Sequence, residues 1–272
     1  MMGNSIQLVV FDWAGTTIDY GCMAPKNVFV EIFKRIGIAI TDAEAREPMG
    51  QNKIDHIREI LKMPAVTKRW VDHYGSMWRE DNVKKIYNDF IPLQVEVVAN
   101  HAELIPGMLE LQNELRRRNI KIGSTTGYNK EIMDVVSVKA AEQGYKPDYV
   151  VCSSDVTAGR PSPWMALKNA SELNVYPLSN IVKVGDTVAD IKEGVNAYMW
   201  SVGVIASSNE MGLTYDEVHS LDTHELSLRI ENIIIKFFDA GAHAVISTID
   251  ELPSLIDKIN SRLNNGLTPH VL

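Results

Sequence analysis

The sequence predicts an α/β fold in which helices cover both faces of a parallel sheet and a block of helices follows the first strand. Short apolar runs of strand length recur along the chain, at residues 8–11, 120–123, 149–152, 181–184 and 202–205. From residue 104 to 272 these runs alternate with helical patterns, which is typical of a parallel sheet. Between about residues 20 and 100 no clear strand run occurs, apart from an ambiguous stretch at 91–98 that Pro92 interrupts.

The segments between the later strands have the spacing of amphipathic helices. Met108, Leu111 and Leu115 repeat at intervals of three and four residues, directly after a Pro-Gly pair that suits a helix start. A second helix is expected after Asn129, because asparagine is a favoured residue at helix N-caps.

The block after the first strand contains three apolar patterns at helical spacing. They are Val28, Ile32 and Ile36; Ile54, Ile57, Ile60 and Leu61; and Trp70, Tyr74, Met77 and Trp78. A helical block in this position looks like an inserted cap domain. We therefore expect a catalytic core domain formed by residues 1–20 and 100–272, and a helical cap domain formed by residues 21–99.

Composition excludes several classes of protein. The chain has 272 residues, 27 of them basic and 35 acidic, for a formal charge of −8. An acidic chain without a basic run is a poor candidate for binding nucleic acid or anionic membranes. No apolar stretch approaches the roughly 18 residues of a membrane span, and the N-terminus lacks the basic region of a signal peptide. The two cysteines form neither a disulfide framework nor a zinc site, so we expect a cytoplasmic protein.

Polar residues gather where four of the predicted strands end. These segments are 12–16, 124–127, 158–163 and 185–190. Ligands of open parallel sheets bind outside the carboxyl ends of the strands, so the four segments should meet at one site. Their carboxylates, hydroxyls and single guanidinium suit an oxyanion held beside a divalent cation.

Each segment also has an ordinary structural explanation. Asp12 could cap a helix, Thr125 and Thr126 could form a turn, and Arg160 could be a solvated loop residue. Asp186 and Asp190 would share one helix face and repel each other mildly. The occurrence of all four segments at consecutive strand ends is much less probable by chance than any single match.

These segments resemble the four motifs of the haloacid dehalogenase superfamily, in the same order along the chain. The resemblance implies a Rossmann-like parallel sheet core with an inserted cap, a nucleophile at Asp12 and a phosphoryl-binding hydroxyl at Thr126, with Thr125 as the alternative. It places Arg160 where the superfamily has a cation, usually lysine. It also implies Mg²⁺ held by Asp12, Asp186 and the backbone carbonyl of Ala14, with Asp190 orienting these ligands.

One residue departs from the pattern of the superfamily's phosphatases. They carry a second aspartate two residues after the nucleophile, which protonates the leaving oxygen, and here that residue is Ala14. An alkoxide leaving group needs a proton, so ordinary phosphate monoester hydrolysis should be disabled. Three explanations remain open: a dead phosphatase, a different acid, or a leaving group that needs no acid there.

The third explanation matches a branch of the superfamily that cleaves carbon–phosphorus bonds. Residues 12–17, 49–53, 159–161 and 241–243 look like that branch. The resemblance implies an imine between Lys53 and a two-carbon phosphonoaldehyde, attack of Asp12 on phosphorus, and release of acetaldehyde and phosphate. A protonated imine is an electron sink, and its formation needs a lysine with a lowered pKa.

The same resemblance suggests the remaining site residues and a partner. Thr126, Gly127 and Arg160 would bind the phosphonate, and Gly50, His56, Cys22 and Met49 would line the substrate cleft. Simple packing is an equally good explanation for His56, Cys22 and Met49. The family is homodimeric through its cap, where the aromatic residues of 70–78 could provide the contact surface, although aromatic stripes are more often core.

Two other functions remain possible from the sequence. One is an ordinary sugar-phosphate phosphatase or a metal-free dehalogenase, which a panel of phosphate esters and haloacids would reveal. The other is a non-catalytic phosphate-binding module, because Ala14 could mark lost activity. Release of acetaldehyde from phosphonoaldehyde and Mg²⁺ would distinguish it from an enzyme.

Overall fold

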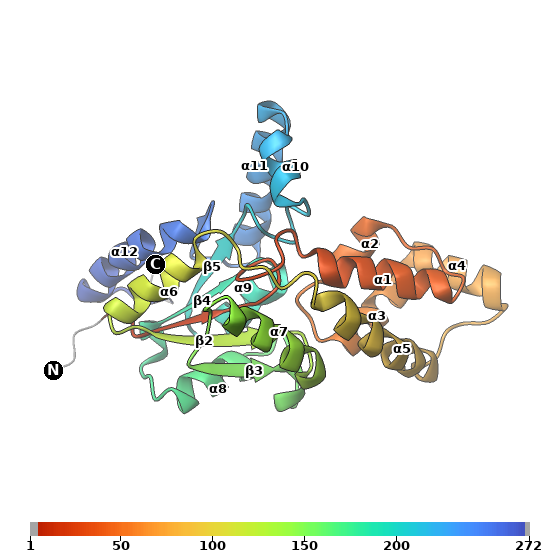
Figure 1. The fold of residues 1–272 in the computed structure, drawn as a ribbon, viewed down its shortest axis with the longest axis horizontal. Coiled ribbons are helices and arrows are strands. Elements are labelled where there is room, and N and C mark those ends of the chain that lie inside the picture. Colours follow the sequence, from red (N-terminus) through yellow and green to blue (C-terminus); the bar gives the residue numbers. More distant parts are fainter. Residues whose placement is uncertain (1–4, 270–272) are drawn as a thin grey trace.

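The fold was obtained as a computed structural model, which describes residues 5–269. Figure 1 shows an α/β core at one end of the molecule and the helices α1–α5 grouped at the other. Within the described residues the core sheet has six strands, ordered β3-β2-β1-β4-β5-β6, and every pairing is parallel. The strands are β1 Leu8–Phe11, β2 Lys121–Thr126, β3 Tyr149–Cys152, β4 Ile181–Gly185, β5 Trp200–Val204 and β6 Ala244–Ile246. The predicted α/β fold is confirmed.

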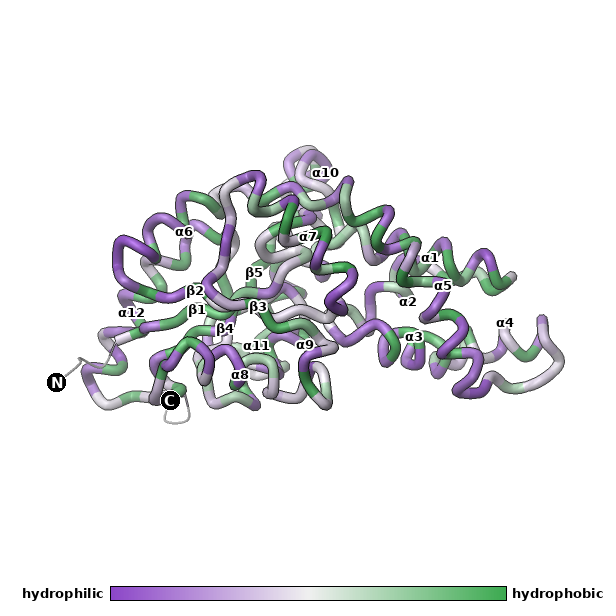
Figure 2. Tube along the Cα trace, turned by 60° about the horizontal axis from the view of Figure 1, so that its bottom comes forward, coloured by the Kyte–Doolittle hydropathy of each residue, from purple (hydrophilic) through white to green (hydrophobic). Residues whose placement is uncertain are grey.

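Helices cover both faces of this sheet. They are α6 Met108–Arg117, α7 Lys130–Glu142, α8 Trp164–Glu172, α9 Val188–Asn196, α11 Thr223–Asp239 and α12 Leu252–Asn264, while α10 Tyr215–Ser220 lies in the connection between β5 and α11 and projects away from the sheet (Figure 1). Alternate residues of the fully buried β1 face opposite layers. Leu8 and Val10 belong to the apolar cluster that includes α8, whereas Val9 and Phe11 belong to the cluster that includes α6, α7 and α12. Figure 2 shows the central strands mainly in the colour of apolar residues, while the surrounding helices carry both colours.

The helical insertion between β1 and β2 consists of α1 Met23–Arg35, α2 Asp42–Arg46, α3 Lys53–Lys62, α4 Pro64–Tyr74 and α5 Glu80–Val98. Its long helices α1 and α5 pack against each other, with the rings of Phe29 and Phe90 4.5 Å apart between centroids. The apolar spacing of residues 28–36 and 54–61 therefore marked real helices.

Two expectations about this block need adjustment. The pattern from Trp70 to Trp78 does not form one helix, because α4 ends at Tyr74 and Gly75 caps it with φ 71°. Glycine adopts this left-handed conformation at little cost, so it terminates the helix before Met77. The ambiguous stretch 91–98 is helical, as the last part of α5, and Pro92 lies inside that helix.

The two chain segments that connect the insertion to the core are paired with each other. Ile18 and Leu104 form an antiparallel bridge, flanked by hydrogen bonds from Asp19 N to Glu103 O (3.1 Å) and from Ile105 N to Thr17 O (2.9 Å). Beside them, Asp19 accepts hydrogen bonds from two backbone N–H groups at the start of α1. The insertion thus leaves and re-enters the core at one place.

Among residues 5–269, no helix combines the length and the apolar character needed to cross a bilayer.

Candidate active site

A small pocket lies where the carboxyl ends of the strands face the helical insertion. Its lining comes from both parts of the molecule and comprises Asp12, Ala14, Cys22, Pro25, Met49, Gly50, Lys53, Thr126, Gly127, Tyr128, Arg160, Asp186 and Thr187. All the residues predicted for the site line this pocket, apart from His56 and Asp190. The four strand-end segments therefore do meet at one site.

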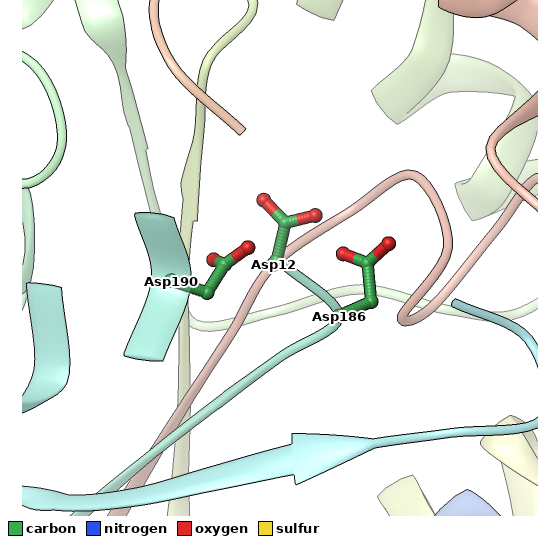
Figure 3. A group of neighbouring side chains, drawn as sticks. All are labelled: Asp12, Asp186 and Asp190. Atoms are coloured by element: carbon green, nitrogen blue, oxygen red, sulfur yellow. The ribbon is translucent and has the colours of Figure 1, made fainter. Parts of the chain in front are cut away.

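Three aspartates form an acidic cluster, of which two line the pocket and the third, Asp190, lies behind them. Asp12 follows β1, Asp186 follows β4 and Asp190 lies in the first turn of α9. All three are buried, and each offers an oxygen that lies within 4.8 Å of the other two (Figure 3). Burial and the charge of Asp190 raise the pKa of Asp12 to about 6. Burial and the charges of Asp12 and Asp190 raise the pKa of Asp186 well above its usual value.

Asp190 differs from the other two aspartates because it is paired with cations. Its Oδ1 contacts Lys183 Nζ (2.7 Å) and Arg160 Nη1 (3.0 Å), and its Oδ2 accepts a hydrogen bond from Thr187 Oγ1 (2.6 Å). Burial acts to raise its pKa, but these cations outweigh burial and hold the pKa below its usual value. Asp190 therefore stays ionised as part of an ion-pair network.

Arg160 joins Asp12 to that network. Its Nη1 lies 2.7 Å from Asp12 Oδ1 and donates to the backbone oxygen of Gly50 (3.3 Å), while its Nε donates to Glu193 Oε2 (2.8 Å). The side chain is almost fully buried. A guanidinium held on several sides presents fixed donors rather than a mobile charge.

The two candidate threonines point in different directions from β2. Thr126 lines the pocket, and its Oγ1 accepts a hydrogen bond from Tyr128 N (3.1 Å). Thr125 is fully buried beneath the pocket, where its Oγ1 donates to Glu193 and accepts from Arg160 Nη2. This alternation follows from the two-residue period of a strand.

Lys53 is the first residue of α3 and brings an amine into the pocket from the insertion. Asn52 caps this helix by accepting a hydrogen bond from Asp55 N (2.9 Å). The Nζ atom lies 5.4 Å from the ring centroid of Phe29 and 5.0 Å from that of Tyr128. Burial lowers the pKa of Lys53 to about 8, against a partial opposing effect of nearby acidic groups. A desolvated lysine of this kind supplies neutral amine near neutral pH.

His56 and Cys22 lie close to Lys53 without providing charge. His56 stacks on Phe29, its Nε2 contacts Ala45 O (2.9 Å), and burial together with the charge of Lys53 lowers its pKa well below the usual value. It lies outside the pocket lining, so it belongs to the structure around Lys53. Burial, reinforced by the charges of Asp186 and Asp19, raises the pKa of the Cys22 thiol well above its ordinary value.

Sequence reasoning missed Tyr128, Lys183 and Glu193. Tyr128 directly follows Gly127, yet an aromatic residue at the start of a helical segment reads as core; its hydroxyl is buried with no hydrogen-bond partner within residues 5–269. Lys183 occupies the middle of the fully buried strand β4. A lysine inside an apolar strand was the signal available for this network, because a buried cation needs acidic partners.

Two glycines allow the insertion to approach the core closely. A Cβ atom on Gly50, which has φ 88°, would lie 2.2 Å from Thr187 Oγ1, and one on Gly127 would lie 2.3 Å from the backbone oxygen of Gln51. Any other residue at either position would push the loop that precedes Lys53 away from the strand ends. The structure is therefore a closed arrangement in which Lys53 and Asp12 share one pocket.

Arg46 of α2 adds a polar contact between the same two parts. Its guanidinium donates to Gly21 O (2.8 Å), Gly212 O (3.1 Å) and Asn209 Oδ1 (3.1 Å). Asn209 in turn donates its backbone N–H to Asp186 Oδ2 (2.8 Å). One side chain of the insertion is thus two contacts away from the acidic cluster.

Comparison with known proteins agrees with this geometry. A family model described as haloacid dehalogenase-like hydrolase matches residues 6–197. The phosphonoacetaldehyde hydrolase of Bacillus cereus (strain AH820) is 49% identical over 257 residues, covering 94% of this chain and 97% of that protein. A crystal structure of a phosphonoacetaldehyde hydrolase-like protein from Oleispira antarctica is 41% identical, with a TM-score of 0.95 and coverage of 97% and 96%.

A longer relative comes from Clostridioides difficile (strain 630). This bifunctional phosphonoacetaldehyde hydrolase/aminoethylphosphonate transaminase is 50% identical over 268 residues, covering 98% of this chain but only 42% of the relative. The chain therefore spans less than half of that bifunctional protein, but nearly the full length of the Bacillus relative. By these matches the chain belongs to the haloacid dehalogenase-like hydrolases and, within them, to the phosphonoacetaldehyde hydrolase family.

Proposed function

We propose that this protein hydrolyses the carbon–phosphorus bond of phosphonoacetaldehyde and releases acetaldehyde and phosphate. The observation that carries the proposal is the shared pocket, in which a lysine with a pKa of about 8 faces a buried aspartate that follows the first strand. An amine activates the aldehyde end of such a substrate, and a carboxylate attacks the phosphorus end. Ala14, at the position where a phosphatase of this superfamily would carry its acid, lines the same pocket.

The first half of the reaction belongs to Lys53. Its neutral Nζ adds to the aldehyde carbon, and loss of water gives a protonated imine. The imine nitrogen withdraws electrons from the neighbouring carbon, so the carbon–phosphorus bond can break with its electron pair leaving as an enamine. No acid at the position of Ala14 is needed, because the leaving group is carbon conjugated to an imine rather than an alkoxide.

The second half belongs to the core residues. Arg160, the Thr126 hydroxyl and Gly127 hold the phosphonate oxygens, since donors fixed in a dry site stabilise the charge of phosphoryl transfer. Asp12 attacks phosphorus in line with the bond to carbon and forms an aspartyl-phosphate. Water hydrolyses this intermediate to phosphate, and the enamine takes up a proton and is hydrolysed from Lys53 as acetaldehyde.

The acidic cluster fits a magnesium ion. Asp12 and Asp186 are buried carboxylates whose pKa values are raised because burial and repulsion from neighbouring carboxylates outweigh the attraction of Arg160. Oxygen ligands of this kind suit Mg²⁺, and the Ala14 carbonyl would complete the protein's ligand set. Asp190 would remain outside that set, because Lys183 and Arg160 already neutralise it. When bound, the ion supplies positive charge against the carboxylates and the phosphonate.

The domain arrangement and the homodimer are proposed from the resemblance to the family. Residues 21–99 act as a cap over a core formed by residues 1–20 and 100–272, and the chain forms a homodimer through the cap. His56, Cys22 and Met49 shape the surroundings of the imine, with Gly50 permitting the cap to seat. Both cysteines are free and buried, which suits the reducing cytoplasm.

The decisive experiment traps the imine. Wild-type protein with Mg²⁺ and phosphonoacetaldehyde should release acetaldehyde and phosphate in equal amounts, and borohydride added with the substrate should inactivate it irreversibly. Peptide mapping should find the reduced adduct on Lys53. Lys53→Arg should lose essentially all turnover, because an arginine with a pKa above about 12 supplies no neutral amine.

The matched control is Lys62→Arg, in the exposed last turn of the same helix α3. That variant should keep wild-type turnover and wild-type trapping. Acetaldehyde release that survives Lys53→Arg, or a label on another lysine, would remove Lys53 from the mechanism.

A further inference from the structure

A buried polar network lies beneath the pocket and includes one acid that the mechanism above does not use. Glu193, on α9, is fully buried, and its Oε2 accepts hydrogen bonds from Arg160 Nε (2.8 Å) and Thr125 Oγ1 (3.0 Å). Lys183 Nζ lies 3.6 Å from the same oxygen. Neither Glu193 nor Thr125 nor Lys183 lines the pocket. Glu193 therefore reaches the substrate site through Arg160.

The contacts of Arg160 fall into two groups, one with the buried residues Glu193 and Thr125 and one with Asp12 in the pocket. In the first group, Nε donates to Glu193 and Nη2 donates to Thr125 Oγ1 (2.6 Å). Because Thr125 also donates to Glu193, the three side chains close a ring of hydrogen bonds. In the second group, Nη1 lies 2.7 Å from Asp12 Oδ1. A guanidinium is planar, so fixing Nε and Nη2 fixes the direction of Nη1.

The buried charges around Arg160 show what the acceptor on Glu193 contributes. Arg160 faces Asp12 and Asp190, and Lys183 faces Asp190 at 2.7 Å. Without Glu193, only the hydrogen bond to Thr125 would hold the guanidinium against the attraction of Asp12 and Asp190. Hydrogen bonds to charged groups are the strong ones, so the contact with Glu193 can balance that attraction.

We infer that Glu193 is a positioning residue which, with Thr125, aims the guanidinium of Arg160 at Asp12 and at the substrate's phosphonate. The inference rests on the proposed function, because it assigns Arg160 to the phosphonate. Helix α9 then provides two acids that contact Arg160 and Lys183, namely Asp190 and Glu193, three residues apart.

Two substitutions at Glu193 separate positioning from general packing. Glutamine keeps an acceptor oxygen toward Arg160, and its amide nitrogen replaces Oε1, an atom without a hydrogen-bond partner in the described residues. Methionine fills a similar volume but accepts no comparable hydrogen bond. Glu193→Gln should keep kcat/KM within about 5-fold of wild type, whereas Glu193→Met should lower it by about 30-fold or more. Equal losses in the two variants would overturn the inference.

A double-mutant cycle with Arg160→Lys shows whether the effect passes through Arg160. A lysine ammonium has no separate Nε and Nη donors, so the hydrogen bonds with Glu193 and Thr125 cannot fix its direction in the same way. Glu193→Met should therefore cost less than about 5-fold when added to Arg160→Lys. Losses that simply multiply would show that Glu193 acts on the fold and not on Arg160.

Further measurements keep the outcome decisive. The affinity for inorganic phosphate, titrated in the presence of Mg²⁺, should fall in Glu193→Met and fall much less when that change is added to Arg160→Lys. This measurement stands even if the wild type proves not to cleave phosphonoacetaldehyde. If Glu193→Met does not fold, Thr125→Val can be used instead. It removes the hydroxyl that accepts from Arg160 Nη2, and it should show the same coupling to Arg160→Lys. An additive result for Thr125→Val would then overturn the inference. Glu131→Gln, on the exposed side of α7, is the matched control and should behave as wild type.

Discussion

The chemistry of Lys53 depends on the surroundings of one nitrogen atom. An ordinary lysine at pH 7 has about one neutral amine in three thousand, whereas a pKa of about 8 leaves roughly one in ten. The lowering comes from burial, which removes water from the ammonium form. Nearby carboxylates act in the opposite direction, so the apolar and aromatic walls around Nζ outweigh them.

This shift predicts the pH dependence of imine formation. Below pH 8 the amine is mostly protonated and above it mostly neutral, so the rate of trapping by cyanoborohydride at saturating substrate should rise with pH and level off above about 8. Mass spectrometry of the reduced adduct at pH 6 to 9.5 measures it. A rate that keeps rising toward pH 10 would mean that the pocket does not lower the pKa of Lys53.

Ala14 leads to a prediction about substrates. Its methyl group has no acidic proton to donate, so an alkyl phosphate, whose alkoxide must be protonated as it leaves, should be hydrolysed at least about 100-fold less efficiently than the phosphonoaldehyde. Ethyl phosphate and glycerol phosphate, compared by phosphate release, provide the measurement. Comparable kcat/KM values for the two classes would show that another residue supplies the acid.

The acidic cluster predicts dependence on a divalent cation. Removing metal with a chelator should abolish turnover, because Asp12 must approach a negatively charged phosphonate while Asp186 remains beside it. Asp186→Ala should have nearly the same effect, since it removes one of the two carboxylates. Asp216→Ala, at an exposed position on α10, serves as the control. Full turnover in excess chelator would contradict the magnesium site.

Side chains near the strand ends could be predicted, and those beneath them could not. Asp12, Thr126, Arg160 and Asp186 follow apolar runs, and the geometry of a parallel sheet gathers such positions at one edge. Glu193 lies inside a helix, where an acidic residue normally faces solvent. Its burial depends on Lys183 from a separate strand, and single-sequence patterns do not reveal which distant charges meet.

The secondary-structure elements show a similar division. Five strands were visible as apolar runs, because strands buried on both faces are continuously apolar. The sixth, β6, has only three residues, two of them partly exposed, so its pattern is too short to recognise. The end of α4 at Gly75 was missed because the aromatic spacing continues past it, although the backbone there is left-handed.

The strand β4 allows a prediction about stability. Lys183 is buried among Asp190, Glu193 and the backbone, so Lys183→Met should leave two acids with less compensation and lower the free energy of unfolding by about 3–5 kcal/mol. Chemical denaturation followed by circular dichroism measures this loss. Lys68→Met, which breaks an exposed pair with Asp72 on α4, should cost less than about 1 kcal/mol. Similar losses in the two variants would show that the Lys183 network contributes little.

The molecule as a whole is held closed by contacts between the insertion and the core. Arg46 donates to Asn209 Oδ1 and Gly212 O of the core, and to Gly21 O where the insertion begins. In Arg46→Ala the insertion should separate from the core more often. Amide exchange across residues 49–53 should therefore become faster, and kcat/KM should fall about tenfold. Arg69→Ala, which removes contacts within the insertion to Ala39 and Glu44, is a control of equal size. Unchanged exchange at 49–53 in Arg46→Ala would show that other contacts hold the closed arrangement.

The bridge between Ile18 and Leu104 has a consequence for how the chain folds and changes. Because the two ends of the insertion are hydrogen-bonded to each other, the insertion is equivalent to one long closed loop between β1 and the rest of the core. The entropy of closing a loop grows only slowly with its length, so the sheet can form at little extra cost whatever lies between the ends. The insertion can therefore be lengthened, shortened or exchanged without changing the strand order. A lineage of such chains could acquire a new reactive side chain, the role we propose for Lys53, while the residues proposed to bind phosphorus stay where they are.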